Sequence, residues 1–151
     1  MKLWMSLYAM IWIVFIEFML EMTPGVSITF LYLHIALGLV IIGLASYNFN
    51  GLRMTAVPGR LKRIAKTTLN LSVVCGILGF LLYFDTGVAS PILFGVTLGG
   101  MILFLHVMIG FAIITQAAAV AIAYDMWEDK EFTKETAPGE VPDMPMPNRS
   151  Q

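Results

Sequence analysis

The sequence contains only two histidines, His34 and His106, and both stand in the same local motif. The two histidines are 72 residues apart (106 minus 34), and in each motif Leu precedes the histidine and Gly follows four residues later. These glycines are Gly38 and Gly110, and each shares a helical face with its histidine because residues four apart are neighbours on a helix. Imidazole is the commonest metal ligand in proteins and an axial ligand of haem iron. The repeat therefore predicts a ligand site built from two facing histidines.

Two imidazoles that face each other across a helical bundle suit a haem, because its iron accepts one ring nitrogen on each face. Ligation also removes the cost of leaving a polar ring in apolar surroundings. Gly38 and Gly110 omit a side chain where a flat macrocycle approaches the backbone. We therefore predict one b-type haem with His34 and His106 as its iron ligands. Two alternatives stay open: the histidines hydrogen-bond neighbouring helices and the glycines are packing contacts, or the site takes another ligand such as chlorophyll or copper.

The composition places this motif in a membrane protein. Of 151 residues, 58% are hydrophobic and 13% are charged, with a mean hydropathy of +0.82, whereas about 25% of the residues in soluble domains are charged. The formal net charge of -1 gives no reason to expect nucleic acid as a partner. Cys75 is the single cysteine, so no intrachain disulfide can form. The sequence has no Walker loop, dinucleotide fingerprint, catalytic triad or metal-thiolate spacing.

Four apolar segments predict an all-α, integral membrane four-helix bundle over residues 1–127, with helices at about 3–22, 26–47, 67–84 and 91–127. His34 then lies eight residues after Val26 and His106 fifteen after Pro91, so equal depth requires that the last helix begin outside the hydrocarbon. The connection between the second and third segments is rich in Lys and Arg. By the positive-inside rule, that loop and both termini are cytoplasmic in a multi-pass protein of the cell membrane. Binding of anionic lipid or a partner protein is an alternative role for this charge.

Residues 128–151 are first charged and then rich in proline, which predicts an extended cytoplasmic tail that cannot fold alone. We expect it to lie on a neighbouring subunit through Val141, Met144 and Met146. In the first helix, Glu17 is a candidate proton or quinol site because intramembrane acids are costly and often functional. Snorkelling of Glu17 or its pairing with another subunit is the alternative.

At the level of helix count and histidine placement, residues 1–127 resemble one half of a haem A synthase. That family duplicates a four-helix unit with a haem-ligating histidine on its second and fourth helices, and His34 and His106 match those positions. The chain is also similar to other small membrane b-type cytochromes. Leu31 and Leu103 stand where the family has an acidic residue three before a ligand histidine, and the external cysteine pair of many members is missing. The resemblance therefore implies haem ligation but not synthase activity.

A haem with both axial positions filled by protein has no site for oxygen or substrate, so electron transfer is its natural chemistry. We expect a non-catalytic electron-transfer subunit of a respiratory or related redox complex, with other membrane subunits, lipid and quinol as partners. A cofactor-free accessory subunit that scaffolds such a complex is the second interpretation, and a haem-modifying protein is the third.

Overall fold

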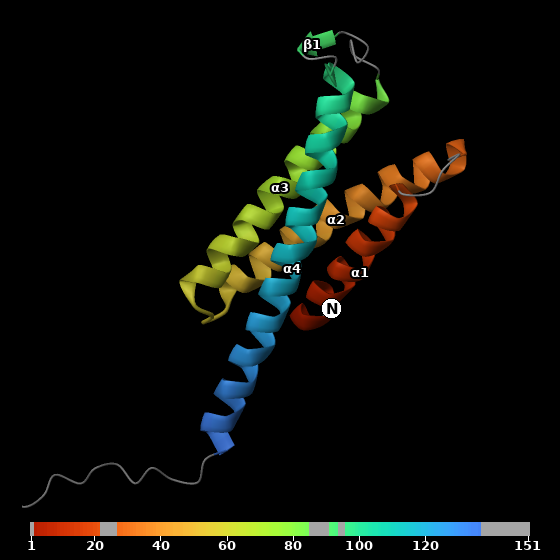
Figure 1. The fold of residues 1–151 in the computed structure, drawn as a ribbon. Coiled ribbons are helices and arrows are strands. Elements are labelled where there is room, and N and C mark those ends of the chain that lie inside the picture. Colours follow the sequence, from red (N-terminus) through yellow and green to blue (C-terminus); the bar gives the residue numbers. More distant parts are fainter. Residues whose placement is uncertain (1, 22–26, 85–90, 94–95, 137–151) are drawn as a thin grey trace, which may run out of the picture.

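A computed structural model describes residues 2–21, 27–84, 91–93 and 96–136. These residues form four long helices and one short hairpin (Figure 1): α1 (Leu3–Glu21), α2 (Ile28–Met54), α3 (Gly59–Tyr83), β1 (Pro91–Leu93), β2 (Val96–Thr97) and α4 (Leu98–Thr136). The two strands pair antiparallel. All four helices are long and apolar enough to cross a membrane, which indicates a multi-pass membrane protein.

The helices form a bundle in which each packs against two others. α1 contacts α2 and α4, and α3 contacts the same two helices, so α2 and α4 face each other diagonally across the bundle. α2 and α4 run in the same direction (Figure 1). The start of α1, the connection from α2 to α3 and the far end of α4 all lie at one end, shown at the bottom of Figure 1. We call this the basic end, because the last turn of α2 and the first turns of α3 carry its cationic residues, Arg53, Arg60, Lys62, Arg63 and Lys66.

Buried side chains recur every three or four residues and form one inward stripe on each helix. In α2 the stripe is Ile41, Ala45, Asn48 and Leu52. Such stripes meet in two apolar clusters, because a helix buries the face that its periodicity repeats. The first cluster comprises Leu7, Leu52, Val57, Leu61, Ala65, Val120, Ala121 and Tyr124. The second comprises Met10, Val14, Ile41, Ala45, Ile113 and Ala117.

Two helix boundaries near the basic end differ from the sequence expectation. α2 continues to Met54 instead of ending at 47, and α3 begins at Gly59 instead of 67. The physical reason is that Leu52 and Leu61 are buried in the first cluster, so the polar residues around them belong to helices whose other face packs in the core. The helices are separated at Pro58, since proline restricts the residue before it and suits the start of a helix.

The boundaries of α4 also differ from the expectation. It begins at Leu98 and not at Pro91, because residues 91–93 and 96–97 pair as a hairpin. It continues to Thr136, so residues 128–136 are helical and not extended tail. Glutamate and lysine, which recur in this segment, propagate a helix well even where the apolar pattern has ended. Residues 137–151, with the expected docking of the tail, lie outside the described part of the chain.

Candidate functional site

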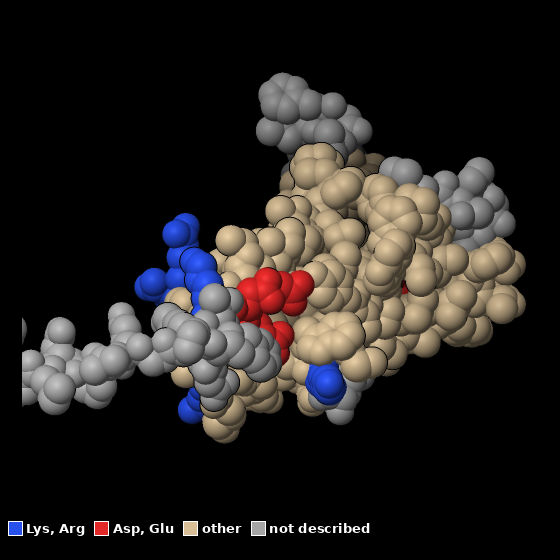
Figure 2. Space-filling view, turned by 90° about the horizontal axis from the view of Figure 1, so that it is seen from below, with Lys and Arg blue, Asp and Glu red and all other residues tan. Residues whose placement is uncertain are grey.

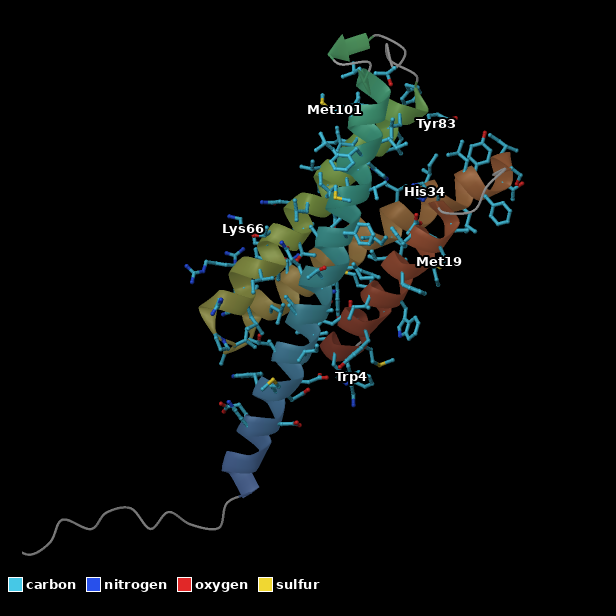
Figure 3. All side chains as sticks on the ribbon, in the orientation of Figure 1. Trp4, Met19, His34, Lys66, Tyr83 and Met101 are labelled. Carbon is cyan, nitrogen blue, oxygen red and sulfur yellow. The ribbon has the colours of Figure 1, made fainter. Side chains whose placement is uncertain are left out.

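The two histidines of the repeat come together across the bundle. The ring centroids of His34 on α2 and His106 on α4 are 6.0 Å apart, and the ring planes are inclined by 58°. His34 is the sixth residue after the start of α2 and His106 the eighth after the start of α4, so the later start of α4 removes most of the depth mismatch expected from the sequence. Figure 3 shows His34 on the part of α2 nearer the end opposite the basic end.

Glu17 of α1 contacts the first of these rings. It continues the buried stripe of its helix one turn after Val14, and its exposed fraction is 7%. The Glu17 Oε2 lies against the Nδ1 of His34, while its Oε1 has no hydrogen-bond partner within the described residues. A carboxylate at one imidazole nitrogen fixes the tautomer and orientation of the ring and directs ligation to the other nitrogen. The sequence singled out Glu17 but not this contact, because only the packing of α1 on α2 creates it.

The second ring is held by α3. The Nδ1 of His106 donates a hydrogen bond to the backbone carbonyl oxygen of Cys75 at 3.0 Å, and the Cys75 Sγ lies 3.5 Å from the same nitrogen. A Cβ at Gly79 would lie 3.1 Å from the His106 Cε1, so glycine there permits the close approach of the ring. The sequence pattern gave no role at the histidine site to Cys75 or Gly79. The sequence feature that could have indicated this contact is the run of small residues on α3, which lies at the same depth in the bundle as His106.

A cavity of about 740 Å³ lies beside both rings and is lined by all four helices. Its volume falls within the range of about 300–1,000 Å³ that is typical of ligand and cofactor sites. The lining includes every site residue singled out in the sequence: Glu17, His34, Gly38, His106 and Gly110. A Cβ added at Gly38 or Gly110 would meet no atom within 4 Å, so the space beside both glycines is open. The repeated motif thus contributes its two imidazole rings and the open space beside its two glycines to one cavity.

The donor set of this cavity is small. Within the described residues, no group of three or more His, Cys, Asp or Glu side chains could hold a metal ion. A metal bound by His34 and His106 would therefore need its remaining ligands from elsewhere, and a macrocyclic cofactor supplies them as ring nitrogens. The residues present fit such a group better than a bare ion, because the cavity provides two imidazoles and room beside the glycines.

Comparison of the chain with protein families, with curated proteins and with solved structures found no match in any of the three.

Proposed function

We propose that the protein is a membrane b-type cytochrome subunit, which holds one haem between His34 and His106 and serves electron transfer in a respiratory or related redox complex. The observation that carries this proposal is the pair of rings, 6.0 Å apart between centroids. Metal–nitrogen bonds of imidazole ligands are about 2.0–2.1 Å long. Two such bonds, together with the distance from each ring nitrogen to its ring centroid, span about the distance between the two centroids. The centroid distance therefore agrees with a single metal atom between the two rings.

The contacts of the two Nδ1 atoms give the proposal further support. Glu17 lies at the Nδ1 of His34 and the Cys75 carbonyl at the Nδ1 of His106. Histidines that bind metals are generally held in this way by an acceptor at the other ring nitrogen. When bound, the haem would supply one-electron redox chemistry. The chain itself orients the two imidazoles, and its apolar cavity wall limits the access of water.

The charge distribution supports an orientation and a location. The basic residues lie at the end of the bundle that also carries the start of α1 and the far end of α4. We place that end in the cytoplasm of a multi-pass protein of the cell membrane, because Lys and Arg are enriched in cytoplasmic loops. The cavity then lies nearer the outer surface, and the other subunits of the complex would supply the electron donor and acceptor.

A cofactor-free scaffolding subunit is the second candidate, and one observation favours it. Both histidines already contact protein groups on neighbouring helices, as they would in a purely structural role. The two candidates differ in what the open space beside Gly38 and Gly110 is for. A structural role gives that space no purpose, whereas a cofactor would occupy it.

An absorption spectrum of the purified full chain in detergent separates the two candidates. After reduction with dithionite we expect the split visible bands of a six-coordinate, low-spin haem. His34→Ala and His106→Ala should each abolish the low-spin spectrum, because each removes one axial ligand. Asn70→Ala is the matched control, since it removes an exposed polar side chain of α3 that does not line the cavity. Wild-type haem content and spin state in either histidine variant would overturn the assignment.

A further inference from the structure

A second cavity, of about 420 Å³, lies between α3 and α4 near the basic end. Four of its lining residues come from the first turns of α3 and three from the middle of α4. We call it the α3–α4 groove, and it is lined by Arg60, Arg63, Ile64, Thr67, Thr115, Gln116 and Ala119. It shares no lining residue with the cavity beside His34 and His106, the histidine cavity, so the two cavities are separate.

Two arginines give the groove its charge. Arg60 and Arg63 are three residues apart on α3, so both guanidinium groups reach the same side of the helix. Within the described residues, neither forms an ion pair with an acidic side chain. Figure 2 shows Lys and Arg groups at the edge of the basic end, with a patch of acidic groups next to them. The groove therefore offers uncompensated positive charge, which favours an anionic ligand with oxygen acceptors.

The other polar side chains of the groove limit which groups can donate hydrogen bonds to a bound anion. The hydroxyls of Thr67 and Thr115 donate to the carbonyl oxygens of Arg63 at 3.0 Å and Phe111 at 2.8 Å, so their protons are already used. Gln116 is held at the groove wall by the Thr68 hydroxyl, which lies 3.0 Å from its Oε1. Donors to a bound anion must then come from the two guanidinium groups and the Gln116 amide nitrogen.

The surroundings of the groove favour a lipid over a free ion. The groove lies between two helices that are apolar enough to cross a membrane. Along the same helix faces, away from the basic end, exposed apolar side chains follow. Val74 lies seven residues after Thr67 on α3, and Met108 lies seven residues before Thr115 on α4. A ligand with an anionic head and an apolar tail would match both parts of this surface.

We propose that the α3–α4 groove binds an anionic phospholipid of the leaflet at the basic end. Its phosphate group is held by Arg60 and Arg63, and its acyl chains lie against the apolar faces of α3 and α4 beyond the groove. Each cationic side chain near a membrane surface contributes attraction for anionic lipid. The groove adds to this general attraction a fixed geometry for one headgroup.

Native mass spectrometry of the full chain, from detergent micelles with equal amounts of phosphatidylglycerol and phosphatidylcholine, tests the proposal. We expect one retained phosphatidylglycerol and little phosphatidylcholine. Replacing Arg60 and Arg63 together by Gln should weaken phosphatidylglycerol binding about tenfold or more, because two phosphate contacts are lost. The control replaces Lys62 and Lys66 by Gln, which removes the same charge from α3 outside the groove lining, and we expect less than about a threefold loss.

A third variant separates the shape of the groove from its charge. Ala119→Phe fills the groove from its exposed wall without changing any charge, and it should also weaken binding of phosphatidylglycerol. Equal losses in the arginine and lysine pairs would overturn the proposal in favour of general electrostatic attraction. Displacement of the lipid by millimolar inorganic phosphate would overturn it in favour of a free anion. The haem spectrum of each variant, recorded in parallel, reports on the histidine site separately.

Discussion

Replacement of Glu17 tests whether the carboxylate supports a ligand histidine. Its Oε2 lies against the His34 Nδ1, and the residue is buried with an exposed fraction of 7%. Loss of such an acceptor behind a metal-bound histidine typically lowers metal affinity about 10–100-fold. This corresponds to about 1.4–2.8 kcal/mol of binding free energy. We therefore expect Glu17→Ala to weaken haem binding by this factor, and Glu17→Gln to weaken it less, because the amide oxygen still accepts a hydrogen bond.

The assay is titration of haem into protein produced without haem, followed by the shift of the main absorption band. Circular dichroism of each variant checks that the helices have formed. Ser6→Ala is the matched control: Ser6 is a buried polar residue of the same helix, its Oγ has no partner within the described residues, and it does not line the cavity. Haem affinity of Ser6→Ala should equal that of the unmodified chain.

Two results would refute this reasoning about Glu17. If Glu17→Ala bound haem as tightly as the unmodified chain, the carboxylate would not support the His34 ring. If Ser6→Ala lost as much affinity as Glu17→Ala, the loss would reflect general damage to α1. If haem affinity is retained in Glu17→Ala while electron transfer from quinol fails, the role of Glu17 as a proton or quinol site, also predicted from the sequence, would be favoured.

Other substitutions test the clearance and packing around the site. Gly38→Leu and Gly110→Leu should lower haem retention more than Gly43→Leu, because the first two glycines line the cavity and the third does not. Haem content after gel filtration measures this retention. Equal losses in all three variants would assign the glycines to general packing. Gly79→Ala places a Cβ 3.1 Å from the Cε1 of His106, so it should displace that ring. We expect this displacement to alter the electron paramagnetic resonance signal of the oxidised haem. An unchanged signal would contradict the contact. Leu52→Ala removes a fully buried side chain and should lower the free energy of unfolding by about 2–5 kcal/mol without changing the haem spectrum, as chemical denaturation in detergent would show.

The number of helices and the identity of the paired histidines could be predicted because each has a strong local signal. Four long apolar segments are visible in composition alone. The recurrence of the only two histidines in one motif was enough to predict that they face each other, and their rings are neighbours in the structure. Helix boundaries were less accessible. The basic residues after Pro58 suggested a loop, although one face of that segment packs in the core through Leu61 and Ala65.

The partners of the two rings could not be predicted, because they depend on contacts between helices. The contact of Glu17 with His34 requires the rotation of α1 that buries Met10 and Val14. The partner of His106 is a backbone carbonyl, at Cys75, and every residue carries one. No pattern of side-chain types can single out such an acceptor. The spacing between helices, and not the spacing along the chain, determines these contacts.

Helix packing and the proposed ligand site occupy different parts of the bundle along its length. The first apolar cluster and the contacts of Tyr8 with Asp125 and of Thr68 with Gln116 lie on the basic side of the histidine cavity. These contacts join α1 to α4 and α3 to α4 without any group at the cavity. Helices that pack closely at one end of a bundle can leave a cavity at the other end, because the closely packed half provides stability that the half with the cavity lacks. Substitutions at His34 or His106 should therefore change ligand binding while the bundle stays folded, so that a spectral loss in these variants reports the site itself.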